Sequence, residues 1–258
     1  MLDYQEITQY FPSTVQSDKR SVLREYLQHH ILHLVFQSPI SKKLIFIGGT
    51  ALRIAYNTQR FSEDLDFDNK DLSLDEWIEL GDYIQRELRL NGWNIDISKT
   101  RLNKTVFHYN IRFPGLLFQY EVSPHKNEVL LIKMDSENQG IEYQSNIFQF
   151  NKFDLNSKIK VMPIDIALSQ KFRAFFDREM GRDLFDISSI APKTKPNYDY
   201  LKQALNISSP QELKERVLAR CQDLDLKHLV ERSKGFLFKQ SDISRILDFQ
   251  EYMEQYEF

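Results

Sequence analysis

Two aspartates and two glycines near one another in the N-terminal part of the chain have the spacing of a metal and phosphate site. Gly48 and Gly49 follow a short apolar run, and Asp64 and Asp66 are two residues apart in a second run. Residues i and i+2 of a strand project from the same face, so these two carboxylates are expected side by side. Mg²⁺ takes few protein carboxylates and keeps positions for phosphate and water. Since glycine lets a phosphate approach the backbone, the two pairs together predict a site for nucleotide phosphates and a divalent metal.

Several neighbouring residues could complete this site. Thr50 can cap a helix that begins there, and the N–H groups and positive end of a helix dipole favour an anion. Arg53 is one turn further and could contact phosphate or the Asp64 carboxylate. Arg60 and Ser62 precede the aspartates and could touch a triphosphate or cap the loop. Each motif alone has a common structural explanation, because Gly-Gly is typical of turns and Asp-x-Asp of exposed strands; their combination is more specific.

A third carboxylate is expected on a strand beside the aspartate pair. The best candidate is Asp135, which closes the apolar run 129–134. Alternation places Lys133 and Asp135 on one face of that strand. Glu137 is the competing candidate, and in the alternative interpretation both acidic residues only make the end of the strand soluble.

Basic and acidic residues recur together further along the chain. Lys171 and Arg178 are seven residues apart, so on a helix they share one face and could neutralise triphosphate charge. Asp183 and Asp186 are three apart on the next predicted helix. One of them could hold Lys171 or Arg182 in position while the other faces the nucleotide or the acceptor. In the alternative interpretation, the lysine and arginine form a solvated face and Asp183 is only an ion-pair partner.

These blocks of residues resemble the AbiEii/AbiGii toxin family of nucleotidyltransferase-like proteins, within the DNA polymerase β-type nucleotidyltransferase superfamily. The resemblance rests on four segments: Gly48–Arg53, Arg60–Phe67, Lys171–Ala174 and Arg182–Asp186. It implies that Asp64 and Asp66 hold the metal, loosely supports Asp135, and makes Lys171 and Asp186 functional residues.

The resemblance also implies an activity and its partners. Family members of this kind transfer NMP from an NTP to an acceptor with Mg²⁺ or Mn²⁺, and pyrophosphate leaves. It implies a toxin of a toxin–antitoxin or phage-defence system, with an antitoxin encoded nearby, and in some members the acceptor is a tRNA 3′ end. Two alternatives stay open: nucleotide transfer to a protein, and a nucleotide- or RNA-binding module without catalysis. The intact aspartate pair and Lys171 argue against the second.

Composition agrees with an ordinary globular enzyme. Of the 258 residues, 41% are hydrophobic and 28% charged, and the net charge of −3 gives no overall nucleic-acid pattern. A local basic cluster of Lys99, Arg101, Lys104 and Arg112 could steer a polyanion. The single cysteine excludes an internal disulfide. Because no apolar run reaches the length of a membrane span and the N-terminus lacks a basic signal start, a cytoplasmic protein is expected.

The pattern of apolar residues predicts an α+β protein, with a nucleotidyltransferase-type mixed β-sheet flanked by helices and followed by a C-terminal helical domain. The expected domains are 1–160 and 161–258. Ser73 and Glu76 have the spacing of a capping box at the start of a helix. Strands are expected at 43–47, 64–68, 93–98, 104–113, 116–122, 128–135 and 141–150. Helices are expected at 18–37, 50–56, 73–90, 163–178, 182–190, 197–206, 210–231 and 241–256.

Overall fold

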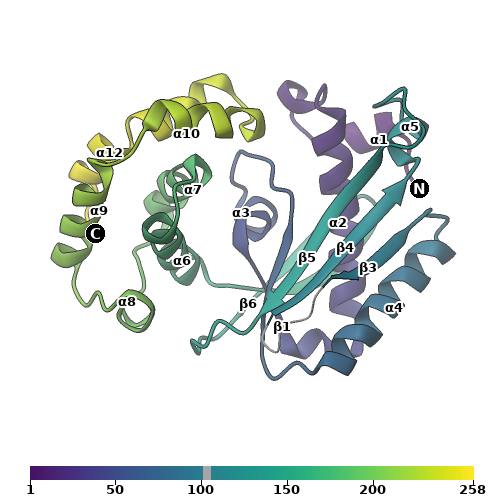
Figure 1. Ribbon diagram of the computed structural model, residues 1–258, viewed down its shortest axis with the longest axis horizontal. Helices are drawn as coiled ribbons and strands as arrows, with labels where there is room; N and C mark the ends of the chain where they lie inside the picture. The colour runs from purple at the N-terminus through teal and green to yellow at the C-terminus, as the bar shows by residue number, and fades with distance from the viewer. Residues whose placement is uncertain (101–105) are drawn as a thin grey trace. The chain divides into compact units, whose positions relative to one another are not determined.

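A computed structural model describes residues 1–100 and 106–258, which form two compact units (Figure 1). Unit 1 contains 1–51, 62–140 and 145–161, and unit 2 contains 52–61, 141–144 and 162–258. The segments 52–61 and 141–144 therefore group with unit 2, whereas the sequence-based boundary places them in the first domain.

Unit 1 is built on a mixed β-sheet, as predicted. Within the described residues the sheet has seven strands in the order β3-β4-β5-β2-β1-β7-β6. The pairs β1/β7 and β2/β5 are parallel, and the other neighbours are antiparallel. The strands are β1 Leu44–Ile47, β2 Leu65–Asn69, β3 Asp96–Thr100, β4 Val106–Pro114, β5 Val129–Glu137, β6 Asn146–Lys152 and β7 Leu155–Val161.

Two long helices of unit 1 pack on this sheet. Helix α2 (Lys19–Gln37) packs against β7 and β5, and α4 (Leu74–Leu90) contacts α2, β3 and β4. The predicted capping box is confirmed, because the side chain of Ser73 accepts from the backbone of Glu76 and the Glu76 side chain accepts from the backbone of Ser73. Between α4 and the sheet, the rings of Trp77 and Tyr109 stack with centroids 4.9 Å apart. Unit 1 also contains the short helices α1 (Tyr4–Thr8) and α5 (Leu116–Gln119) and the start of α3 (Gly48–Tyr56).

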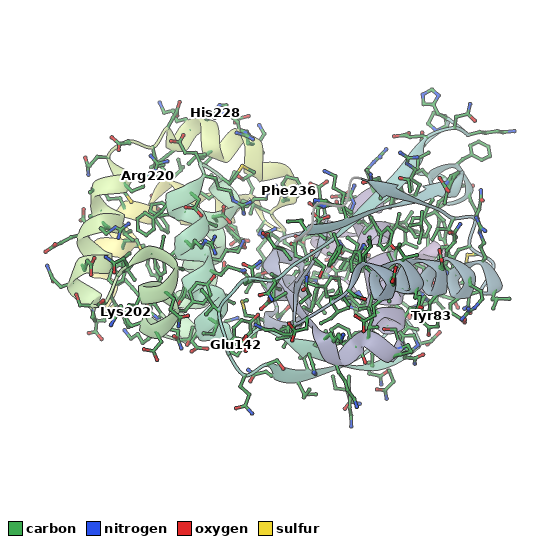
Figure 2. All side chains as sticks on the ribbon, turned by 60° about the horizontal axis from the view of Figure 1, so that its bottom comes forward. Tyr83, Glu142, Lys202, Arg220, His228 and Phe236 are labelled. Carbon is green, nitrogen blue, oxygen red and sulfur yellow. The ribbon has the colours of Figure 1, made fainter. Side chains whose placement is uncertain are left out.

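Unit 2 is helical, as predicted, and side chains fill its interior (Figure 2). The helix predicted over 210–231 is wrong as a single helix: the chain leaves α9 after Cys221 and restarts at Leu226, where Asp225 caps α10. The region 241–256 is likewise divided between two helices. The helices are α6 Ile164–Asp177, α7 Gly181–Ile190, α8 Tyr198–Leu205, α9 Pro210–Cys221, α10 Leu226–Ser233, α11 Ser244–Leu247 and α12 Phe249–Gln255.

Other local predictions need correction. The segment 116–122 is not a strand, because the chain turns at Gly115 and forms α5, which buries Leu116 and Leu117. Strand β7 is absent from the prediction, although Leu155, Ile159 and Val161 alternate with polar residues as in a half-buried strand. Arg101 and Lys104 of the basic cluster lie outside the described residues.

Across the described ranges, no helix has both the length and the apolar character needed to cross a bilayer.

Candidate active site

Asp66 and Asp135 occupy neighbouring positions on two parallel strands of unit 1. Asp66 of β2 is the register partner of Ile47 in β1 and of Asp135 in β5. Register partners on adjacent strands project from the same face of a sheet, about 4.8 Å apart. The side chain of Asp135 is 34% exposed, and Asp66 is half-buried. The sheet therefore places two carboxylates side by side where solvent and a ligand can reach them.

The backbone of Gly48 lies directly against the Asp66 carboxylate. Gly48 has φ +77°, and it is where the chain turns from β1 into α3. A Cβ atom built on Gly48 would lie 2.3 Å from Oδ2 of Asp66. Only glycine meets both requirements, a left-handed backbone and this close approach. The glycine at this position is thus explained by the carboxylate that it contacts.

We expect Gly48→Ala to disrupt the site itself as well as the local backbone. The methyl group must displace the Asp66 carboxylate, so the activity of the site should fall about 100-fold or more, and the strained φ should cost about 1–3 kcal/mol of unfolding free energy. Gly115→Ala is the matched control, because Gly115 has φ +74° but nothing within 4 Å of the added Cβ. Activity assays and urea denaturation of both variants separate the two effects. Equal activity in the two variants would contradict the importance of the close approach.

Thr50 does not cap the helix, which corrects the prediction. Helix α3 begins at Gly48, so Thr50 lies inside the first turn and is fully buried. Its hydroxyl donates to the backbone oxygen of Asp64 at 2.5 Å. This bond ties the start of α3 to the residue that precedes β2. Gly49 is buried in the same turn.

The other acidic residues near the pair have different positions. Asp64 lies just before β2 begins. Asp68 is fully buried and accepts from the backbone N–H of Gln139 at 2.9 Å, so it stabilises the neighbouring loop. Glu137 is the register partner of Asp68, whereas Asp135 is the partner of Asp66. The register therefore favours Asp135 over Glu137 as the second carboxylate beside Asp66.

The predicted set of three carboxylates is not assembled as a group. In the part of the chain that the structure describes, no three His, Cys, Asp or Glu side chains are arranged to hold a metal ion. Mg²⁺ is commonly bound through only one or two carboxylates plus substrate phosphates. Asp66 and Asp135 supply two such hard oxygen donors beside the glycine backbone, so the donor set fits Mg²⁺ or Mn²⁺ as a two-carboxylate site. Asp64 stays a prediction.

Lys171 and the two downstream aspartates form a buried charge network in unit 2. Nζ of Lys171 is 2.9 Å from Oδ1 of Asp183 and 2.7 Å from Oδ2 of Asp186. Burial acts to lower the pKa of Lys171, but the two carboxylates outweigh it and the pKa is raised. Lys171 is therefore cationic at neutral pH. Helix α7, with Asp183 and Asp186 three residues apart, presents both carboxylates to α6.

Two arginines extend the network. Nε and Nη2 of Arg60 each lie 2.6 Å from an oxygen of Asp186, and Nη1 donates to the backbone oxygen of Phe61 at 2.8 Å. Arg178 follows α6 and donates from Nε and Nη2 to Asp183 at 2.8 Å and 3.0 Å. The Arg178 side chain is 58% exposed, whereas that of Arg60 is 3% exposed. Arg178 is thus the solvent-facing end of the network.

These surroundings change the roles that the sequence suggested. Asp186 is fully buried, so its contacts support a role in holding Lys171 and Arg60 rather than in facing a nucleotide. Arg60 is expected from the sequence at a triphosphate, but its guanidinium is buried against Asp186. The guanidinium of Arg53 donates to Asn57 Oδ1 and to the Thr58 backbone oxygen, at 3.2 Å and 3.1 Å.

The smaller sequence-predicted contributors have local contacts as well. The backbone oxygen of Ser62 accepts a hydrogen bond from Gln28 Nε2 at 3.1 Å. The guanidinium of Arg182 lies over the ring of Phe236, 4.5 Å from its centroid, and Phe236 is labelled in Figure 2. Arg182 therefore packs on an aromatic ring. Lys171 forms ion pairs with both Asp183 and Asp186.

One residue beside the carboxylates was missed by sequence reasoning. His108 of β4 is the register partner of Asp135, and its Nδ1 is 2.6 Å from Oδ1 of that aspartate. The alternation of β4 indicates that His108 lies on the polar face of its strand. Only the strand order and register place it beside Asp135, and neither can be read from the sequence.

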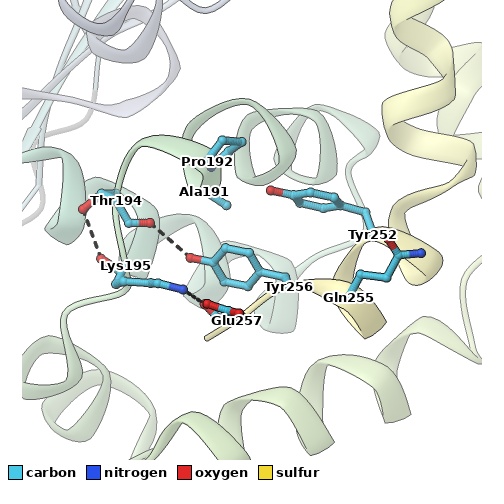
Figure 3. Close-up of a pocket in the computed structure, with 8 residues that line it drawn as sticks. All are labelled: Ala191, Pro192, Thr194, Lys195, Tyr252, Gln255, Tyr256 and Glu257. Atoms are coloured by element: carbon cyan, nitrogen blue, oxygen red, sulfur yellow. Dashed lines mark hydrogen bonds between the residues drawn. The ribbon is translucent and has the colours of Figure 1, made fainter.

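A separate pocket of about 470 Å³ lies in unit 2 (Figure 3). Tyr256 donates to the Thr194 backbone oxygen at 3.1 Å, and Lys195 lies 4.8 Å from the centroid of the same ring. The residues that line the pocket are Ala191, Pro192, Thr194, Lys195, Tyr252, Gln255, Tyr256 and Glu257. None of them is a predicted site residue.

Solved structures first define the class to which this fold belongs. The chain is similar to the nucleotidyltransferase toxin MenT4 of Mycobacterium tuberculosis, with TM-score 0.59, 17% identity and coverage of 99% of this chain and 90% of that one. It is also similar to a putative nucleotidyltransferase of Helicobacter pylori, with TM-score 0.59, 19% identity and coverage of 92% and 95%. The H. pylori protein JHP933 gives TM-score 0.57 at 19% identity, with 92% of each chain covered. The fold is thus that of the nucleotidyltransferase toxins.

The family follows from the sequence itself. Residues 32–256 match the family described as nucleotidyl transferase AbiEii toxin, type IV toxin–antitoxin system. The chain therefore belongs to the AbiEii family and is a nucleotidyltransferase. No curated protein matches the sequence.

Proposed function

We propose that this protein transfers NMP from an NTP to an RNA hydroxyl, such as the 3′ end of a tRNA, in a reaction that requires Mg²⁺ or Mn²⁺. The observation that carries the proposal is the pairing of Asp66 with Asp135 beside the backbone of Gly48. Asp66 and Asp135, with Asp64 as a further candidate, would hold the metal. When bound, the metal would neutralise phosphate charge and bring the triphosphate and the attacking oxygen together.

The proposed reaction is an in-line displacement at the α-phosphorus. The acceptor oxygen forms a bond to the α-phosphorus, and the bond from that phosphorus to the oxygen bridging to the β-phosphate breaks. Pyrophosphate leaves, and the acceptor hydroxyl gives up its proton to a carboxylate of the site. The backbone N–H groups at the start of α3, at Gly49 and Thr50, are suited to donate hydrogen bonds to phosphate oxygens.

The charge network of unit 2 contains Lys171, for which a catalytic role is expected from the sequence. Asp183 and Asp186 keep Lys171 charged and fixed, and Arg60 holds Asp186 in turn. We assign Lys171 to stabilising the charge of the leaving pyrophosphate, and Asp186 to positioning Lys171. Arg178, the exposed end of the network, is the candidate for direct contact with phosphate.

The biological setting follows from the family. We propose that the protein acts in the cytoplasm as the toxin of a toxin–antitoxin or phage-defence system, with a cognate antitoxin encoded nearby. Its target would then be an RNA pool whose modification arrests growth.

A label-transfer assay tests the function. Each α-³²P-labelled NTP is incubated with the protein, Mg²⁺ and total RNA, and the products are treated with RNase or protease. Label in RNase-sensitive material that is absent with Asp66→Ala and reduced with Lys171→Ala supports the proposal. Label in protease-sensitive material would show that the acceptor is a protein. NTP binding without pyrophosphate release would refute catalysis. Equal transfer by all three proteins would refute the roles assigned to Asp66 and Lys171.

A further inference from the structure

His108 stands beside one of the two paired carboxylates, on the side away from the other. The register across three neighbouring strands runs from Asp66 in β2 to Asp135 in β5 and to His108 in β4. Nδ1 of His108 and Oδ1 of Asp135 are 2.6 Å apart. Both side chains are partly exposed, 41% for His108 and 34% for Asp135. Neither is held in place by complete burial, and the hydrogen bond between them restrains the carboxylate.

The chemistry of this pair fixes which atom donates. An ionised carboxylate can only accept, so the hydrogen lies on Nδ1 of His108. The bond occupies one lone pair of Oδ1 and leaves Oδ2 of Asp135 to a ligand. Ligands of metal ions bind more tightly when such an outer hydrogen bond orients them before the metal arrives.

We propose that His108 is a positioning residue, which holds Asp135 in the orientation that receives a divalent cation together with Asp66. This inference rests on the metal site of the proposed function. His108 acts through Asp135 and itself need contact neither the metal nor the nucleotide. Its contribution is to reduce the conformational freedom that a half-exposed carboxylate would otherwise lose on binding.

The test compares two substitutions of similar size at one position. His108→Leu removes the donor, whereas His108→Asn retains an N–H donor close to the place of Nδ1. The measured quantity is the Mn²⁺ dissociation constant of the protein without nucleotide, obtained from the free-ion signal in electron paramagnetic resonance. We expect His108→Leu to weaken Mn²⁺ binding about 10-fold or more, and His108→Asn to stay within about twofold of the unsubstituted protein.

A double-mutant cycle separates positioning from other effects. If His108 acts only through Asp135, then His108→Leu should have little further effect in a protein that already carries Asp135→Asn. An undiminished effect of His108→Leu in that background, or Mn²⁺ binding by His108→Asn as weak as by His108→Leu, would overturn the inference. So would unchanged binding by His108→Leu.

Failure of the inference and failure of the proposed function give different results. If Asp66→Asn and Asp135→Asn both bind Mn²⁺ as the unsubstituted protein does, the metal site itself is wrong. If those two variants bind Mn²⁺ more weakly and His108→Leu does not, only the role of His108 is wrong. His228→Leu is the matched control, because His228 is an exposed histidine of α10 (Figure 2) and should leave Mn²⁺ binding unchanged. Melting temperatures of all variants show that each is folded.

Discussion

Asp66→Asn is expected to reduce nucleotide transfer by about 1,000-fold or more while the protein stays folded. The substitution keeps the size of the side chain and removes its charge. Because Asp66 is the carboxylate that lies between Gly48 and Asp135, its loss would remove the central ligand of the proposed metal site. A ligand that contributes several kcal/mol of transition-state stabilisation corresponds to a rate loss of this size. The measurement is the initial rate of label transfer at saturating Mg²⁺ and NTP.

Asp96→Asn is the control for this prediction. Asp96 lies on β3 of the same sheet, its side chain is 58% exposed, and its nearest basic partner is Arg112 at 3.9 Å. The same chemical change there should leave the rate within about twofold, since exposed ion pairs contribute little. A rate for Asp66→Asn above about one-tenth of the unsubstituted rate would be incompatible with a metal ligand at this position.

The local part of the site could be predicted from the sequence because segments that follow one another in the chain build it. Gly48 and Asp66 are brought together by one short helix and one strand pairing, and Ile47↔Asp66 in that pairing is enough to place the glycine beside the carboxylate. The capping box of α4 is also local, since Ser73 and Glu76 are three residues apart. Features that depend on one turn, or on the alternation of residues within one strand, can be predicted from residue types and their spacing.

The rest of the site depends on register between distant strands. The choice of Asp135 over Glu137 requires knowing that β2 and β5 are parallel and which residues pair. His108 requires one further strand pairing, and the place of β7 between β1 and β6 is likewise set by its pairing with β1, which is not its neighbour in the chain. A shift of one residue in any of these pairings would turn the side chains to the opposite face. No pattern within one segment carries this information.

The role of Arg60 illustrates the same limit in unit 2. Its place in the sequence, just before the aspartate strand, indicates a phosphate contact. In the structure its guanidinium is bound by Asp186, which is 126 positions away in the chain. Charge alone could not distinguish a ligand contact from a buried structural partner, because both need an arginine.

Asp186→Asn is expected to lower the free energy of unfolding by about 3–5 kcal/mol at pH 7. Asp186 is fully buried and compensates two cations, Arg60 and Lys171, at 2.6 Å and 2.7 Å. Removing one partner of a buried ion pair leaves charge that is neither hydrated nor paired, which is far more costly than losing a surface pair. Urea denaturation gives the change directly. Asp177→Asn is the matched control, because Asp177 is 59% exposed and pairs with Arg173 at 3.5 Å, so its loss should cost less than about 1 kcal/mol.

The pH dependence of this loss distinguishes a charge effect from a packing effect. Burial acts to raise the pKa of Asp186, but Arg60 and Lys171 outweigh it and hold the pKa below the ordinary 3.8. A carboxyl whose pKa is depressed in the folded state contributes stability above its unfolded pKa and loses it as the pH falls through the folded value. The difference between Asp186→Asn and the unsubstituted protein should therefore be constant from pH 5 to pH 8 and shrink below about pH 4. A difference that persists undiminished at pH 3 would instead indicate that the amide disturbs packing, and that Asp186 does not act through its charge.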